Sequence, residues 1–261
     1  MKIMTKALMI VLPFLIPAVL YAQSADEIMK KFTDHYDVAD ETVNAAMIMV
    51  NKQGAEHERS LTILSKKYPH DLTHMLIRFT SPQNINGTGI LIYENPDRGD
   101  DQWLFLPALK KVKKISSSER SHRFMGSEFA YEDLRGEERR DFSYNLLHTE
   151  QLDGHDCFVI EAMPKSERKS SETGYSKRIQ WIRKDIFFRT KTEYYDKSGK
   201  LLKTEADEDI MDVGKGKYRM KKVTMLNNQT GEKTILISNS VKIGTGIPDS
   251  KFTLRYLEQG S

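Results

Sequence analysis

Residues 57–82, HERSLTILSKKYPHDLTHMLIRFTSP, contain two β-rich runs separated by Pro69. Side chains alternate between the two faces of a strand, so Leu61, Ile63 and Ser65 share one face of the first run. Such runs, ended by proline, are typical of strands. The stretch therefore predicts two neighbouring strands with an apolar face that must be buried against another layer.

The same period-two pattern continues along the chain to residue 243. Several of its runs are joined by short turn sequences, which are LDGH (152–155), DKSGK (196–200), GKGK (214–217) and NNQTGE (227–232). We therefore expect a mainly β protein with about eleven or twelve short antiparallel strands, in the form of a barrel or sandwich. After residue 22 no linker rich in Pro, Gly or Ser divides the chain, so residues 23–261 are predicted to form one domain.

The first residues are typical of a secretory signal. Lys2 and Lys6 precede an apolar run that ends at Ala22. A retained membrane anchor is the alternative, but the run is short and is interrupted by Pro13 and Pro17. No cysteine directly follows the run, so no lipid can be attached there. We expect a cleaved signal peptide at residues 1–22 and an exported, soluble protein without a lipid anchor.

A helix is predicted directly after the signal. Ser24 and Glu27 have the spacing of a capping box, in which each side chain accepts a hydrogen bond from the backbone of the other. Ile28, Phe32 and Tyr36 then recur every four residues and give the helix one apolar stripe. We expect this stripe to pack on the sheet.

Two segments interrupt the strand pattern. Residues 116–142 are polar and irregular around Phe124, Phe129 and Tyr131, and these aromatic side chains need a surface on which to pack. We expect the segment, from residue 116 to 135 in particular, to form a lid or a strand-bridging element that moves more than the strands. Residues 165–174, KSERKSSETG, contain no apolar side chain and are predicted to be a mobile hairpin tip.

No group of residues predicts catalysis. His70 and His74 are four apart on an expected strand, which separates them by about 13 Å and excludes a shared metal ion. Cys157 is the only cysteine, so no disulfide forms within the chain. The acidic run EADEDIMD, residues 205–212, is predicted to be a solvated strand face. A net charge of +3 with both signs mixed argues against nucleic-acid binding. We therefore expect a protein that is not an enzyme and needs no cofactor or metal.

Three stretches in order, DQWLFLPALKKVKKI (101–115), FMGSEFAYEDL (124–134) and FTLRYLE (252–258), resemble the LolA-like family of periplasmic outer membrane lipoprotein-sorting proteins. The resemblance implies an unclosed antiparallel β-barrel with a lid over an apolar cavity that receives acyl chains. It also implies a link to inner-membrane export pumps of the resistance–nodulation–division type. In KKYPHDL, Tyr68 replaces the arginine that links lid and barrel in the best-known carrier, so a different lid contact is expected.

Methionines on strands suit a surface that accepts varied apolar shapes. Trp103 and Phe105 lie on one face of their strand and Leu104 and Leu106 on the other, and we expect the aromatic pair to face the cavity. The predicted wall comprises Met47, Met49, Leu61, Ile63, Met75, Ile77, Trp103, Phe105, Phe124, Phe129 and Tyr131. A basic mouth is predicted from Lys110, Lys111, Lys113 and Lys114.

These observations favour a monomeric periplasmic carrier of lipoproteins or other envelope lipids. The alternative is an envelope sensor or accessory subunit that uses the same fold to bind a membrane partner. A sensor holds its partner stably and has no need to exchange cargo between membranes.

Overall fold

Thirteen antiparallel strands form one continuous sheet in the computed structural model, which describes residues 23–259. The sheet follows the order β6-β5-β4-β3-β2-β1-β13-β12-β11-β10-β9-β8-β7. Its strands are β1 (Asp40–Val50), β2 (Glu56–Tyr68), β3 (Leu72–Ser81), β4 (Gly89–Tyr93), β5 (Asp101–Leu106), β6 (Lys111–Lys114), β7 (Phe142–Leu152), β8 (His155–Pro164), β9 (Lys177–Arg183), β10 (Arg189–Tyr195), β11 (Leu201–Gly214), β12 (Lys217–Asn227) and β13 (Lys233–Ile243). The predicted signal, residues 1–22, lies outside the described residues.

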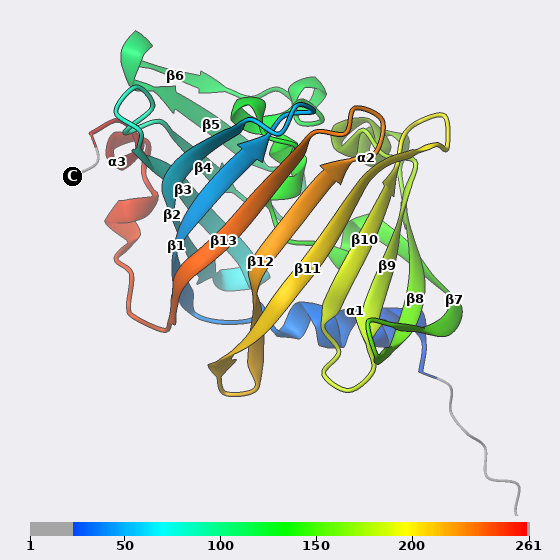
Figure 1. Cartoon of the computed structure of the whole chain (residues 1–261). Helices are drawn as coiled ribbons and strands as arrows, with labels where there is room; N and C mark the ends of the chain where they lie inside the picture. The colour runs from blue at the N-terminus through cyan, green and yellow to red at the C-terminus, as the bar shows by residue number, and fades with distance from the viewer. Residues whose placement is uncertain (1–22, 260–261) are drawn as a thin grey trace, which may run out of the picture.

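The sheet is strongly curved but not closed, since β6 and β7 are its two free edges (Figure 1). This arrangement confirms the expected unclosed barrel. Register shifts at Asn44/Ala45, Ser60/Leu61 and Leu146/His148 are β-bulges, which increase local twist and help a long sheet to coil. The sequence prediction omitted β6, because its sequence KVKK contains only one apolar residue.

The turn sequences form hairpins as predicted. Asp153 and Gly154 join β7 to β8 with φ of 50° and 80°, and Lys215 and Gly216 join β11 to β12 with φ of 57° and 67°. Positive φ at both central residues is the geometry of a type I′ turn, whose twist matches that of the flanking strands.

Within residues 23–259, three helices and a series of short 3-10 turns cover the sheet. The helices are α1 (Ala25–Asp34), α2 (Glu167–Thr173) and α3 (Leu254–Gln259). We call residues 116–141 the cover; its 3-10 turns are η3 (Ser117–Glu119), η4 (Phe124–Gly126), η5 (Tyr131–Leu134) and η6 (Arg139–Asp141). Three further 3-10 turns are η1 (Pro69–Asp71), η2 (Pro107–Leu109) and η7 (Asp249–Phe252). The cover lies within the curve of the sheet, whereas α3 lies outside it near β3 and β4 (Figure 1). No helix in residues 23–259 is long and apolar enough to cross a membrane.

Helix α1 begins as the sequence predicts. Ser24 Oγ accepts a hydrogen bond from Glu27 N at 3.2 Å, and Glu27 Oε2 accepts one from Ser24 N at 3.0 Å. Its stripe packs Ile28, Met29 and Phe32 against the concave side of β8 and β9 and against Phe188. The helix therefore closes one end of the concave face.

Two predictions of solvent exposure, one for a loop and one for a strand face, are wrong for a shared reason, which is the burial of paired charges. Residues 167–173 form α2 rather than a mobile tip, and Lys169 and Glu172 are almost completely buried in ion pairs. In the acidic run, Glu205 and Asp207 are also buried, because both pair with Arg189 on the neighbouring strand. Composition alone indicates solvent exposure for such segments, and only tertiary partners reverse it.

Candidate functional site

The concave side of β1–β5 is a continuous apolar surface. Strand pairing aligns Ala45 with Leu61, Leu61 with Phe79, and Ile77 with Ile90. Five of the predicted wall residues that lie on strands belong to this cluster: Met47, Leu61 and Ile77 are buried, and Ile63 and Met75 are partly buried at its edge. The structure therefore brings together the methionines and aliphatic residues that we predicted from the strand pattern.

Trp103 and Phe105 lie on the convex side of the sheet, which contradicts the prediction that they share a face with this cluster. They pack with Leu76 and Leu91 against the C-terminal segment, including Phe252. Leu104, which we expected on the face away from the cavity, is instead 6% exposed within the concave cluster. Strand alternation places residues 103 and 105 opposite 104 and 106, but the layer that covers each side decides which pair faces inward.

Two other predicted wall residues lie beside the main cluster. Met49 is half-buried opposite Thr234 near the end of β1. Phe129 packs instead with Tyr175, Tyr194 and Met225 over β10–β12. These residues extend the covered surface across the middle of the sheet.

The cover fills the apolar half of the concave face in this structure. The ring of Phe124 stacks on Phe79 with centroids 5.7 Å apart and meets Tyr131 edge to face at 5.5 Å. Both cover residues belong to the concave cluster, at 1% and 9% exposure. Arg59 of β2 holds the same turn, because its Nη1 donates to the carbonyl of Met125 at 2.7 Å. An irregular segment thus takes the place of a second sheet.

Tyr68 does not contact the cover. Its hydroxyl donates to Asp249 Oδ1 at 2.9 Å, and its ring packs on His74 and Phe252, so it attaches β2 to the C-terminal segment. The expectation of a different lid contact is consistent with this arrangement, in which Arg59 of the same strand bonds to the cover.

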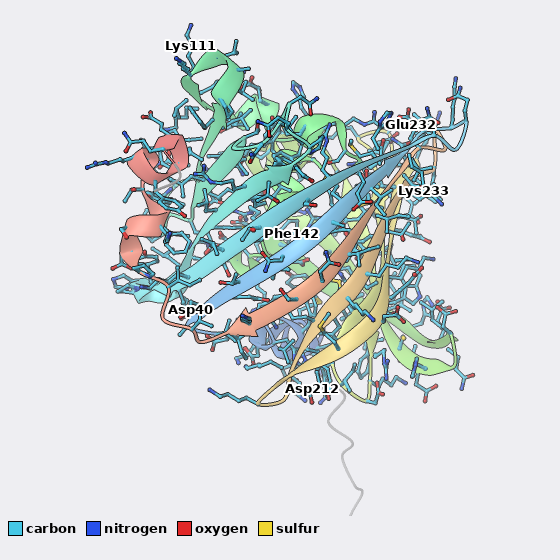
Figure 2. The ribbon with its side chains drawn as sticks, turned by 60° about the vertical axis from the view of Figure 1, so that its left-hand side comes forward. Asp40, Lys111, Phe142, Asp212, Glu232 and Lys233 are labelled. Atoms are coloured by element: carbon cyan, nitrogen blue, oxygen red, sulfur yellow. The ribbon has the colours of Figure 1, made fainter. Side chains whose placement is uncertain are left out.

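The four predicted basic residues lie within the β5–β6 hairpin and are exposed. Lys111 lies at the outer end of this hairpin (Figure 2). Lys113 pairs with Glu119 of the cover, and Lys114 Nζ lies 2.6 Å from Asp101 Oδ1. Lys110 adopts a left-handed conformation with φ of 49° at the end of η2. Their predicted role at a cavity mouth stays a prediction.

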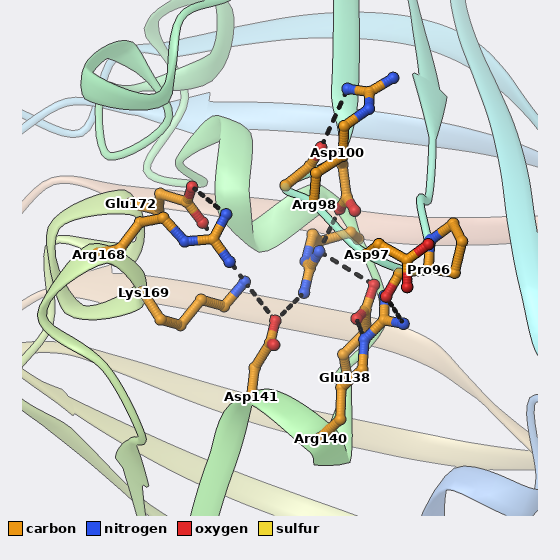
Figure 3. A pocket seen from close by; sticks show the side chains of 12 residues that line it. Pro96, Asp97, Arg98, Asp100, Glu138, Arg140, Asp141, Arg168, Lys169 and Glu172 are labelled. Atoms are coloured by element: carbon orange, nitrogen blue, oxygen red, sulfur yellow. Dashed lines mark hydrogen bonds and ion pairs between the residues drawn. The ribbon is translucent and has the colours of Figure 1, made fainter.

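A polar pocket of about 200 Å³ lies between the cover, α2 and the β4–β5 loop (Figure 3). Lys169 Nζ of α2 is 2.6 Å from Glu132 and 3.0 Å from Asp141 of the cover. Arg135 also belongs to the cover, and it pairs with Asp100 of the loop and lies 3.2 Å from Asp141. We call this group of six side chains the ion-pair clasp: Asp100, Glu132, Arg135, Glu138, Asp141 and Lys169.

The clasp is charged despite its burial. Burial opposes the charge of Arg135, but Glu132, Asp100 and Glu138 raise its pKa well above the ordinary value. Burial likewise works against charge on Glu132, yet Arg135 and Lys169 hold the pKa of that carboxyl below its ordinary value. These pairs therefore fasten the cover electrostatically at the end away from Phe124.

The sequence prediction missed Arg59, the clasp and the buried polar groups on the inner side of β9–β12. Its one available signal was the density of both charge signs in residues 132–141, which we described only as part of a polar, irregular segment. Within residues 23–259, no three His, Cys, Asp or Glu side chains are arranged to hold a metal ion.

The curved open sheet with a separate cover over an apolar concave face is that of proteins with a LolA-like fold. A structure described as a putative outer membrane lipoprotein-sorting protein domain from Vibrio parahaemolyticus is 33% identical, with a TM-score of 0.85 over 90% of this chain and 98% of that one. A DUF1329 family protein from Desulfovibrio piger is 28% identical, with a TM-score of 0.84 over 89% and 97% of the two chains. A LolA superfamily protein from Nitrosomonas europaea is 26% identical, with a TM-score of 0.73 over 90% and 100%.

A family model described only as "-like: Uncharacterized protein" matches residues 71–259. No curated protein matches the sequence. The chain belongs to the LolA-like family of outer membrane lipoprotein-sorting proteins. This follows from its identity with the Vibrio structure over most of both chains and from the family match.

Proposed function

We propose that the protein is a periplasmic carrier that binds the acyl chains of lipoproteins or other envelope lipids on the concave side of β1–β5. The observation that carries this proposal is that a separate, aperiodic segment covers this apolar surface through Phe124 and Tyr131. Burial of each methylene contributes about 0.8 kcal/mol, so an acyl chain that replaces these two rings again shields the wall from water and offsets much of the free energy of opening.

The proposed cycle needs the cover to move while the sheet stays folded. The cover is attached by contacts that involve side chains. They include the aromatic contacts, the ion-pair clasp, the bond from Arg59 to Met125 and a bond from Glu128 N to Thr234 Oγ1 of β13 at 2.9 Å. None of these contacts is part of the strand ladder, so displacement of the cover would expose the wall without breaking any strand pair.

The finer features of the carrier are also proposals. We place the mature protein, beginning near Gln23, in the periplasm as a monomer without catalytic activity. By the resemblance of its motifs, its cargo would come from an inner-membrane partner such as an export pump of the resistance–nodulation–division type. The names of the similar structures support lipoprotein sorting as the wider role.

A reversible crosslink tests whether the cover must move. Glu128→Cys and Thr234→Cys, in a Cys157→Ala background, place two cysteines where a backbone N and a side-chain oxygen are now 2.9 Å apart. The oxidised protein should fail to take up a fluorescent fatty acid, and reduction should restore uptake. Each single-cysteine variant under the same oxidant is the matched control. Equal uptake by the crosslinked and reduced forms would contradict the proposal.

A further inference from the structure

One carboxylate of the cover contacts β7 and β9, in the half of the concave face that lies away from the apolar cluster of β1–β5. Glu137 lies between η5 and η6, and its side chain is 3% exposed. Its Oε1 accepts a hydrogen bond from Tyr144 Oη at 2.7 Å, and both oxygens accept from Gln180 Nε2 at 3.1 and 3.0 Å. Arg178 Nη1 lies 3.7 Å from Oε2. Every group that the sheet directs at this carboxylate is a donor.

This donor set is built into the sheet and does not depend on the cover. Tyr144 of β7 and Arg178 of β9 are both paired with Ala162 of β8, whose small side chain leaves space between them. Gln180 lies two residues further along β9 on the same face and is fully buried. The three side chains therefore form a concave group that stays in place if the cover leaves.

Arg178 is positioned by aromatic rings. Its guanidinium lies 5.0 Å from the ring centre of Phe142, 5.5 Å from that of Tyr175 and 5.3 Å from that of Tyr194. Its Nε has no hydrogen-bond partner among the described residues, and Gln180 Oε1 also has none there. Rings orient a cation but do not neutralise it, so removal of Glu137 would leave a buried positive charge without a counter-ion.

We propose that Glu137 occupies the position of the anionic head group of the cargo, so that on loading a phosphate or carboxylate replaces it between Tyr144, Arg178 and Gln180. This inference rests on the proposed function and names the polar end of the ligand. A cationic head group meets only donors there, and an uncharged one leaves Arg178 without a counter-ion. An anion satisfies both the charge and the hydrogen bonds.

Apolar side chains lead from the middle of the sheet to the apolar wall, whereas β11, which lies between β12 and this site, directs Lys203, Glu205 and Asp207 to the concave side. Val223 and Met225 of β12 are buried on the concave side, next to Leu236 of β13. Leu236 is paired with Val223 on one side and with Met47 on the other. Apolar side chains thus connect the middle of the sheet with β1, which is the first strand of the wall.

Three lipids with the same oleoyl chain separate the contribution of the head group to affinity from that of the chain. They are oleoyl lysophosphatidic acid, oleate and 1-oleoylglycerol. We would measure their Kd values by titration calorimetry below the aggregation concentration of each lipid. Wild-type protein should bind the phosphate lipid at least tenfold more tightly than 1-oleoylglycerol. The relative affinity of oleate then tells a phosphate site from a general anion site, and either result supports an anion site.

Variants test which residues cause the preference for an anionic head group. Arg178→Gln and, independently, Gln180→Leu should each reduce the head-group preference at least fivefold while 1-oleoylglycerol affinity changes less than twofold. Glu137→Gln removes the competing carboxylate and should tighten binding of the phosphate lipid. Arg183→Gln is the matched control, because Arg183 lies on β9 but packs on the opposite side, against Asp185.

The outcomes separate this inference from the function on which it rests. If all three lipids bind with equal affinity, or if Arg178→Gln weakens them all alike, carriage stands and the anion site is wrong. Unchanged binding in Glu137→Gln also rejects the role of Glu137 as a stand-in. If none of the lipids binds, the proposed carriage fails, and this inference fails with it.

Discussion

Substitution of Phe124 by alanine tests whether the cover opens independently of the sheet. Phe124 is 1% exposed and contacts Phe79 of the sheet and Tyr131 of the cover. Replacement of a buried phenylalanine by alanine typically costs about 3–5 kcal/mol. If the cover is a separate cooperative unit, this cost falls on the closing of the cover, and about 3 kcal/mol corresponds to a more than hundredfold change in its closing equilibrium.

Amide hydrogen exchange measures this equilibrium directly. One amide of the cover donates directly to the sheet, because Glu128 N bonds to Thr234 Oγ1 of β13 at 2.9 Å. This bond breaks when the cover leaves, so protection of the Glu128 amide should fall about a hundredfold or more in Phe124→Ala. Protection of Phe79 N, which bonds to Thr88 O at 2.9 Å beside β4, should change little.

A second phenylalanine provides the control. Phe252 is 2% exposed and packs on the convex side of the sheet, away from the cover. Phe252→Ala should destabilise the whole domain without a selective effect on the cover amides. If Phe124→Ala lowers the protection of cover and strand amides by the same factor, the cover is part of the global folding unit and independent opening is refuted.

Three further predictions follow from buried groups. Burial raises the pKa of Glu94 from 4.5 to about 7, so between these pH values the folded state holds a proton that the unfolded state has lost. The free energy of unfolding should therefore fall as pH rises through this range. Urea unfolding at pH 5 and pH 8 should show that Glu94→Gln removes up to about 3 kcal/mol of this loss. Arg135→Gln leaves the clasp carboxylates without their central cation and should lower the free energy of unfolding by about 3–5 kcal/mol. The control Arg139→Gln breaks no ion pair found within residues 23–259 and should lower it by less than about 0.5 kcal/mol. Phe105→Ala should lower the thermal midpoint but leave the fatty-acid Kd of the folded protein unchanged; a large change in Kd would show that the convex side takes part in binding.

Local rules predicted most of the strands, the start of α1 and the hairpin turns. The capping box at Ser24 and the turn at Asp153 depend on residues within a few positions of each other, so short-range chemistry is sufficient to specify them. Strand alternation likewise placed Leu61 and Ile63 on one apolar face. These features need no knowledge of the rest of the chain.

The candidate site depends on contacts between distant segments. Gln180 and Glu137 are 43 residues apart, and Arg59 and Met125 are 66 apart. A polar residue is predicted to be exposed unless its partner is known. For this reason we placed Lys169 in a mobile hairpin tip and gave Arg135 and Glu137 no partners.

The sequence by itself determined that the chain forms a curled antiparallel sheet and that Trp103 and Leu104 point to opposite sides of it. It did not determine which side is concave. That choice belongs to the tertiary structure, because Phe252 from the end of the chain covers the side of Trp103 and Phe124 covers the side of Leu104. Alternation is a property of one strand, whereas inside and outside are defined only when a second layer packs against it.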